Sequence, residues 1–180
     1  MIIKQTEYNV DFFGSVLLSI TVCPKCGYKS RDVLSLGTRE PTLIQARIDS
    51  LSDLDIKVIK SGTATIKIPE FGATITPGPN SEGFMTNIEG VLTRIEDVLT
   101  FMLSSAGPEE VRSGERILDQ IRKARASEPR FTIIIEDPFG NSSLVSSDPS
   151  KIEKRKLTKD ELKEIKFGQH VLDLNDIVSH

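Results

Sequence analysis

Residues Thr42 to Ile48 read TLIQARI, with an apolar residue at every second position from Ile44 onward. Successive side chains of a β-strand point to opposite faces, so this period of two predicts a strand with one buried face. The same alternation returns at residues 56–58 and 64–68, which are separated by a Ser-Gly turn. We therefore expect antiparallel neighbouring strands here.

Further runs of β-branched and apolar residues lie on both sides of this region. Residues 16–22 and 32–36 precede it, and residues 71–76 and 131–135 follow it. Their composition predicts additional strands. The last run ends in a Pro-Phe-Gly-Asn turn and is followed by a short return strand at 144–145. A mainly β body is the resulting expectation.

The apolar period changes after Thr86, where residues recur at steps of three and four: Ile88, Val91, Leu92, Ile95, Val98, Leu99 and Met102. This spacing places them on one stripe of a helix. Thr86 and Glu89 match a capping box, in which a hydroxyl and a carboxylate satisfy free backbone N–H groups at the helix start. We expect the helix to begin there.

A second helix is predicted from Gly107-Pro108, because proline is tolerated in the first turn of a helix. Gly114 indicates either a kink or two short helices. The two helices form a hairpin at about residues 86–126. A final short helix is predicted between the capping box at Thr158 and a stop at Gly168.

The composition indicates which kinds of protein this chain can be. The chain has 180 residues, 38% of them hydrophobic and 27% charged, which favours one globular body over disorder. Neither a signal peptide nor a membrane span fits the sequence, so we expect a cytoplasmic protein with reduced cysteines. Net charge is −3, and Lys151–Lys166 carries seven basic against four acidic residues. Nucleic acid is therefore an unfavoured partner.

Cys23-Pro24-Lys25-Cys26-Gly27-Tyr28 is the strongest local motif. Two thiolates on a tight turn can bind one metal ion, but a structural zinc site has four ligands. His170 and His180 are the two histidines of the chain, and their spacing does not match that of a zinc site. Shared zinc between two chains, a redox pair and a metal-free turn remain alternatives.

Catalytic constellations are not evident in the sequence. Ser-His-Asp, phosphate-binding Gly loop and His-Glu-x-x-His patterns do not occur. Glu136 and Asp137 are adjacent, and adjacent residues of a strand point to opposite faces, so we interpret them as the start of the turn at Pro138 rather than as paired carboxylates.

Several segments, in this order, carry a resemblance to a known family. They are the Cys-x-x-Cys knuckle, residues 58–61 (VIKS), 66–70 (IKIPE), 83–90 (GFMTNIEG) and 131–142. The chain resembles the ZPR-type zinc-finger family over nearly its whole length. Eukaryotic members have two cassettes of zinc ribbon and β-domain, and this chain is similar to a single, archaeal-type cassette.

The resemblance implies an α+β, mainly β fold: a double-stranded β-helix (jelly-roll-like) with an inserted helical hairpin, preceded by a zinc ribbon. We expect residues 1–36 to form a partial ribbon and residues 37–180 the body. The resemblance also implies zinc as cofactor, no enzymatic activity, and a role as adaptor or folding helper for translation elongation factor one alpha. A homodimer is an alternative assembly.

Site residues are carried over by matching motifs. Cys23 and Cys26 match the second Cys-x-x-Cys of the family's ribbon, whereas the first pair has no counterpart in this sequence. We expect this half site not to hold zinc tightly in a monomer. Candidate partner-binding residues are those of the turn: Asp137, Gly140, Asn141 and Ser142.

Two rival functions remain on sequence grounds. A double-stranded β-helix can house a catalytic metal, but such sites use several histidine and carboxylate ligands, and no histidine precedes His170. A thiol redox protein could use Cys23 and Cys26, although redox Cys-x-x-Cys pairs lie between a strand and a helix rather than between strands.

Overall fold

The computed structural model describes residues 1–10, 14–35, 39–78, 81–126 and 129–165. Its N-terminal part is an antiparallel sheet in the order β1-β2-β3. Its strands are β1 (Ile2–Val10), β2 (Gly14–Val22) and β3 (Lys29–Ser35). We call this the ribbon sheet. β1 was not predicted, because the side chains of residues 2–9 are exposed and carry no one-sided apolar pattern.

Two further sheets form the body, in the orders β10-β5-β8 and β11-β4-β9-β6-β7. The smaller sheet consists of β5 (Lys57–Lys60), β8 (Phe84–Asn87) and β10 (Ser143–Val145). The larger consists of β4 (Thr42–Ile48), β6 (Thr65–Ile68), β7 (Ala73–Ile75), β9 (Phe131–Asp137) and β11 (Ile152–Lys156). The mainly β prediction is confirmed.

Strand alternation is clearest in β9, where every second side chain from Phe131 to Asp137 is buried. β4 and β9 pair antiparallel, with Ile44 opposite Ile135. The inward faces of both sheets and the helical hairpin enclose one apolar core. β8 and β11 were not predicted; β11 is a charged edge strand, and charge on an edge protects it from pairing with other chains.

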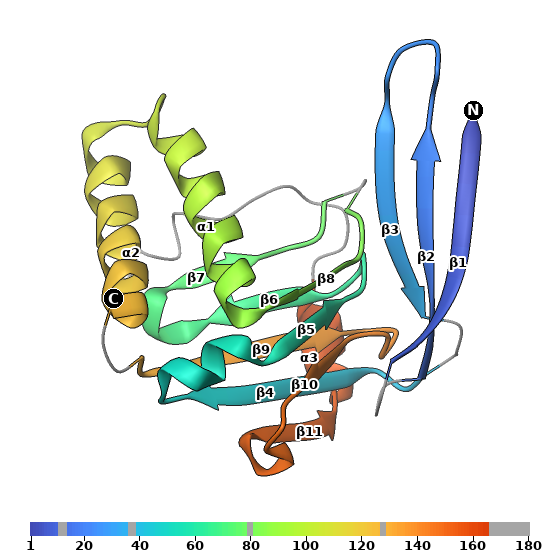
Figure 1. The fold of residues 1–180 in the computed structure, drawn as a ribbon. Helices are drawn as coiled ribbons and strands as arrows, with labels where there is room; N and C mark the ends of the chain where they lie inside the picture. The colour runs from blue at the N-terminus through green and yellow to red at the C-terminus, as the bar shows by residue number, and fades with distance from the viewer. Residues whose placement is uncertain (11–13, 36–38, 79–80, 127–128, 166–180) are drawn as a thin grey trace.

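The helical hairpin consists of α1 (Ile88–Leu103) and α2 (Pro108–Ala126). In Figure 1 it stands at the opposite end of the body from the ribbon sheet. α1 buries five residues of the predicted stripe: Ile88, Val91, Leu92, Ile95 and Leu99. No helix among the described residues is long and apolar enough to cross a membrane.

The start of α1 differs from the prediction by one residue. Asn87 is the N-cap, and its side-chain oxygen accepts a hydrogen bond from the N–H of Gly90 at 2.9 Å. Thr86 lies in β8, where it pairs with Val58. Because Thr86 is held in the sheet, the helix begins after it.

α2 is one continuous helix through Gly114, so the alternative of two short helices is wrong. A Cβ atom at Gly114 would lie 2.6 Å from Leu103 Cδ2, so the glycine lets α2 approach the end of α1 closely.

Short elements complete the chain: η1 (Leu51–Asp55), η2 (Pro69–Phe71), η3 (Pro149–Lys151) and α3 (Lys159–Glu164). The predicted capping box at Thr158 is present, although α3 ends at Glu164 and the predicted stop at Gly168 lies outside the described residues. Phe71 belongs to η2, so the strand predicted from residue 71 begins at Ala73.

Candidate functional site

The Cys23–Cys26 knuckle connects β2 to β3 at the end of the ribbon sheet. The N–H of Gly27 donates to Cys23 O at 2.9 Å, and the N–H of Cys23 donates to Tyr28 O at 2.8 Å. Gly27 has φ of 72°, a left-handed conformation that favours glycine. The turn thus holds two free thiols near each other at the surface.

Hydrogen bonds from the backbone N–H groups of Cys26 and Lys25, and from the Cys26 thiol, lower the pKa of the Cys23 thiol. That chemistry suits metal binding, which uses the thiolate form. Two donors are half of a structural zinc site, and no group of three or more metal-binding side chains occurs among the described residues. His170 and His180 lie outside them.

The N-terminal end of β1 lies beside this knuckle. Ile2 is the cross-strand partner of Val22, the residue directly before Cys23. Any group carried immediately before β1 is therefore delivered next to Cys23 and Cys26. The N-terminal end of β1 and the knuckle thus lie at the same end of the ribbon sheet, and a zinc ribbon here stays a prediction.

The second candidate site, the turn after β9, is organised by a buried carboxylate. Asp137 is 0% exposed. Its Oδ2 accepts hydrogen bonds from Ser61 Oγ at 2.8 Å and Ser142 Oγ at 2.6 Å. Its Oδ1 accepts from the N–H of Phe139 at 3.0 Å and from Thr63 Oγ1 at 3.3 Å. The carboxylate therefore connects the turn to the loop that follows β5.

Gly140 closes the same turn. It has φ of 64°, and its N–H donates to Asp137 O at 3.1 Å. A Cβ atom here would lie 2.2 Å from Glu40 O, so any side chain would push the turn away from the start of β4. Glycine is needed for both conformation and space.

Lys60 is the large charged side chain at the centre of this region, with 2% of its surface exposed. Its Nζ donates to Ser61 O at 2.9 Å and lies 5.7 Å from the centre of the Phe84 ring. Burial lowers the pKa of Lys60 to about 8, although the charge of Asp137 acts in the opposite direction. We call Lys60, Ser61, Thr63, Asp137 and Ser142 the buried polar cluster.

The structure brings the predicted turn residues together but places two of them inside the protein. Asp137 and Ser142 are both 0% exposed, whereas Phe139 is 54% exposed. Asn141 is half-buried, and its buried Oδ1 has no hydrogen-bond partner among the described residues. A role of this turn in partner binding stays a prediction, and it would act through the shape of the turn and through Phe139 and Asn141.

Adjacent Glu136 and Asp137 point apart, as interpreted from the strand geometry. Glu136 forms an ion pair with Lys67 at 2.8 Å on the outer face, while Asp137 is buried. The hydrogen bonds of Ser61 and Thr63 to Asp137, and the burial of Lys60 beside them, were not predicted. The signal available in the sequence was Lys60, which directly follows the apolar residues 58–59. A charged side chain next to such a run needs a polar partner if it is buried.

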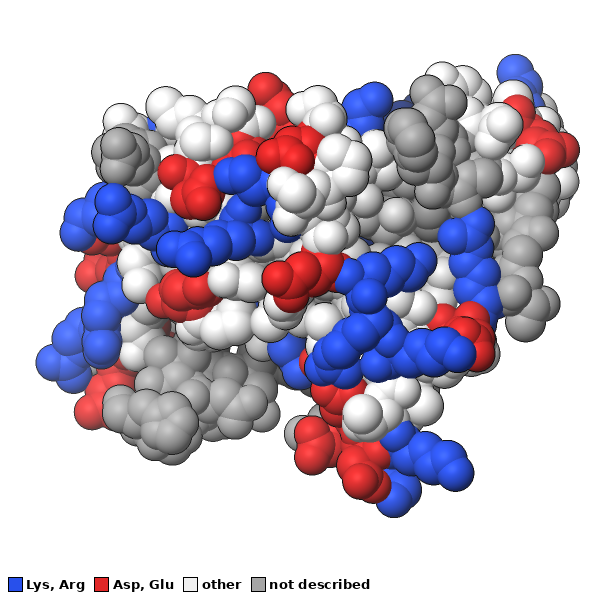
Figure 2. Space-filling view, turned by 90° about the horizontal axis from the view of Figure 1, so that it is seen from below, with Lys and Arg blue, Asp and Glu red and all other residues white. Residues whose placement is uncertain are grey.

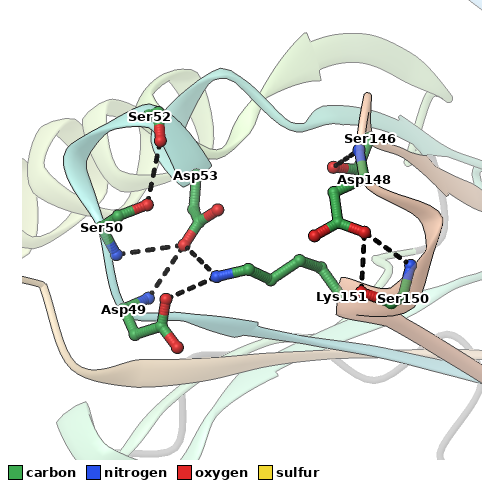
Figure 3. A network of polar contacts seen from close by, with 8 residues as sticks. All are labelled: Asp49, Ser50, Ser52, Asp53, Ser146, Asp148, Ser150 and Lys151. Atoms are coloured by element: carbon green, nitrogen blue, oxygen red, sulfur yellow. Dashed lines mark hydrogen bonds and ion pairs between the residues drawn. The ribbon is translucent and has the colours of Figure 1, made fainter.

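A cleft of about 660 Å³ lies between the end of β1 and residues 50–57 and 145–151. Figure 3 shows Lys151 reaching across to Asp49 and Asp53. Asp53 Oδ2 also accepts from the N–H groups of Asp49 at 3.1 Å and Ser50 at 3.0 Å. Because Lys151, Asp49 and Asp53 pair with one another, this network holds η1 and η3 together.

Three basic residues of β11 and α3 are also paired. Arg155 contacts Glu161 at 2.6 Å, Lys156 contacts Glu40 at 2.7 Å, and Lys163 contacts Asp160 at 2.9 Å. Figure 2 shows the same mixing of charges, with Lys and Arg next to Asp and Glu over the lower face. Four basic residues of the segment, Lys151, Arg155, Lys156 and Lys163, are thus paired with carboxylates.

Comparison with known proteins agrees with the motif order. Residues 52–169 match the ZPR1 jelly-roll domain. An uncharacterised ZPR1-like protein of Pyrococcus horikoshii is 38% identical over 172 residues, covering 93% of this chain and 76% of that protein. One of Methanocaldococcus jannaschii is 34% identical over 174 residues, covering 96% and 86%.

The zinc finger chaperone zpr1 of Schizosaccharomyces pombe is 34% identical over 142 residues, which are 76% of this chain and 31% of that protein. The match to a jelly-roll domain confirms the predicted architecture of the body. The shared region covers a minor part of the fission yeast protein.

Proposed function

Because the chain belongs to the ZPR1 family, we propose that it is a non-enzymatic binding protein that assists the folding of a translation factor. The observation that carries this proposal is the 34% identity to a protein named a zinc finger chaperone. The proposed partner is translation elongation factor one alpha.

The buried polar cluster supports a structural rather than a catalytic use of its acid. The carboxylate of Asp137 is fully buried, and hydrogen bonds from Ser61 and Ser142 reach its Oδ2. A general acid or base has to come within hydrogen-bond reach of substrate. Asp137 instead stabilises the turn that connects β9 to β10.

We also propose that the knuckle binds zinc through its two cysteines. Cys23 and Cys26 would provide two thiolates, and the backbone N–H groups of Lys25 and Cys26 already stabilise the Cys23 thiolate. The remaining two ligands would have to come from outside the described residues or from a second molecule.

Affinity capture tests the function. Immobilised chain is mixed with purified elongation factor one alpha from the same organism, in native form and during dilution from denaturant. We expect the chain to bind the refolding factor and to raise its yield of GTP-binding protein. Equal yields with and without the chain, together with no capture, would contradict the proposal.

An Asn141→Ala variant tests whether the turn contacts the partner. Its Oδ1 has no hydrogen-bond partner among the described residues, so removing it should leave the melting temperature nearly unchanged. If the turn binds the factor, capture by this variant weakens. A fall in melting temperature with unchanged capture would assign Asn141 to the turn alone.

A further inference from the structure

A groove of about 620 Å³ separates the ribbon sheet from the body. It is lined by one face of β2 and β3, by residues 82–85 and by Arg94 of α1. In Figure 1, β3 is the strand of the ribbon sheet nearest the body, and it contacts β8. We call this space the ribbon groove.

Apolar side chains from both parts line the groove. Leu18, Ile20 and Val33 come from the ribbon sheet, and Phe84 and Met85 come from β8. Ile20 is 43% exposed and Met85 38% exposed. Exposed apolar side chains gathered in a concave site are a common feature of binding surfaces.

Basic groups border this apolar lining. Lys29 and Arg31 lie on β3, and the Arg94 guanidinium lies 4.3 Å from the centre of the Phe84 ring. None of these three cations forms an ion pair with a carboxylate in the part of the chain that the structure describes. The buried Lys60 ammonium lies near the same ring, 5.7 Å from its centre.

The two acids of the groove are already used by other donors. Asp32 Oδ1 accepts from the N–H of Gly83 at 2.7 Å and from its neighbour Val33 at 2.8 Å. Glu82 Oε2 accepts from the N–H of Arg31 at 3.3 Å, and its Oε1 accepts from Ser30. These bonds hold the ribbon sheet to the body and leave the cationic side chains as open donors.

The groove also runs between two strand edges. β3 is the last strand of the ribbon sheet, and β8 is the last strand of the smaller body sheet. Peptides that bind along sheet edges do so in extended form, with alternate side chains entering the site. The edges of β3 and β8 touch near Gly83, where a Cβ atom would lie 2.5 Å from Val33 O, so an extended occupant would lie over the lining residues and turn alternate side chains toward them.

We propose that the ribbon groove binds an extended acidic segment of a partner protein, in which apolar residues alternate with Asp or Glu. The apolar side chains pack on Ile20, Phe84 and Met85, and the carboxylates pair with Lys29, Arg31 and Arg94. This proposal rests on the proposed binding function and names the chemistry of the partner segment. A nucleic-acid strand fits less well, because every unit of its backbone is charged and it offers no aliphatic side chains to pack on Ile20 and Met85.

The test measures fluorescence anisotropy of a labelled short peptide of alternating leucine and glutamate, titrated with the full chain. A peptide of alternating leucine and lysine and a single-stranded oligonucleotide serve as comparison probes. We expect the acidic peptide to bind, and its affinity to fall with added salt, since exposed ion pairs are screened.

Two double variants compare the groove with a distant surface. Lys29→Gln with Arg31→Gln removes two exposed cations of the groove, and Arg116→Gln with Arg122→Gln removes two exposed cations of α2. We expect the groove variant to bind the acidic peptide about three- to tenfold more weakly, the loss expected for two exposed ion pairs. The α2 variant should bind as the unaltered chain does, and both should retain their melting temperature.

Several results would overturn the proposal. These are no binding of the acidic peptide, equal weakening by both double variants, or tighter binding of either comparison probe. A dimer that the groove variant dissociates would show instead that a second copy occupies the groove. Capture of the elongation factor is measured separately, so capture without peptide binding would reject the groove while leaving the proposed function intact.

Discussion

At the turn after β9, Gly140 combines a left-handed φ of 64° with a close approach to Glu40 O. Gly140→Ala should therefore lower the free energy of unfolding by about 2–4 kcal/mol, from backbone strain plus displacement of the turn. Chemical denaturation monitored by circular dichroism measures the change.

Gly78→Ala is the matched control for this substitution. A Cβ atom at Gly78 meets no atom within 4 Å, so the free energy of unfolding should change by at most about 0.5 kcal/mol. Equal effects at the two positions would show that the turn does not depend on glycine at 140.

The buried ammonium of Lys60 predicts that the stability of the fold depends on pH. Its pKa is lowered to about 8 in the folded protein by burial, from an ordinary value of 10.5. The unfolded chain therefore binds more protons between these values, and stability rises with pH. Relative to Lys60→Met, the unaltered chain should gain about 2–3 kcal/mol as pH rises from 8 toward 10.5.

Denaturation of both proteins at several pH values gives this difference directly. Tyrosines and other lysines titrate in both proteins, so their contribution cancels in the comparison. A difference in free energy that stays constant with pH would show that burial does not lower the pKa of Lys60 in the folded protein.

Ion pairs of Lys151 with Asp49 and Asp53 connect the two short helices η1 and η3. Burial of Asp53 would raise its pKa, but the N–H of Asp49, the Lys151 ammonium and Ser50 together lower it to about 2. A lowered carboxylate pKa stabilises the fold above the unfolded pKa of 3.8, and that stabilisation is lost as pH falls toward 2.

Asp53→Asn should therefore cost about 1–2 kcal/mol at neutral pH, and the cost should diminish as pH falls from 4 to 2. The free energy of unfolding of the variant and the unaltered chain is measured at each pH. Asp55→Asn, at an exposed neighbouring position, serves as control. A loss at Asp53 that is independent of pH would contradict a role for its charge.

At the scale of the whole molecule, the ribbon sheet and the body have separate sources of stability. The body has an extensive apolar core, whereas the ribbon sheet meets the body through a small cluster of Val16 and Ile59, with Val33 and Val145 packed against them. Structural zinc can contribute about 10 kcal/mol or more to a small domain, but only when four ligands close around it.

We therefore predict that a monomer of this chain binds no zinc tightly and that a chelator leaves the melting of its body unchanged. Native mass spectrometry measures the zinc content, and circular dichroism with and without chelator measures the melting. One zinc on a monomer would contradict this prediction. One zinc per dimer, lost in Cys23→Ser with Cys26→Ser, would indicate a four-cysteine site shared between two chains.

Local patterns along the chain were sufficient for the elements whose signals are local. Alternation predicted β4, a run of β-branched and aromatic residues predicted β9, the three- and four-residue spacing predicted α1, and the capping box predicted the start of α3. These signals depend on residues within one strand or one helical turn. The knuckle motif likewise placed Cys23 and Cys26 on one turn.

Tertiary structure alone decided the rest, because it depends on contacts between distant residues. Ser61 and Asp137 are 76 positions apart, so their bond, and the burial of Lys60 beside it, follow from how β5 and the end of β9 meet. β1 and β11 carry too many exposed polar residues to show a strand pattern, and their pairing defines them. The ribbon groove exists because two strand edges from separate sheets face each other, and no local sequence pattern encodes that arrangement.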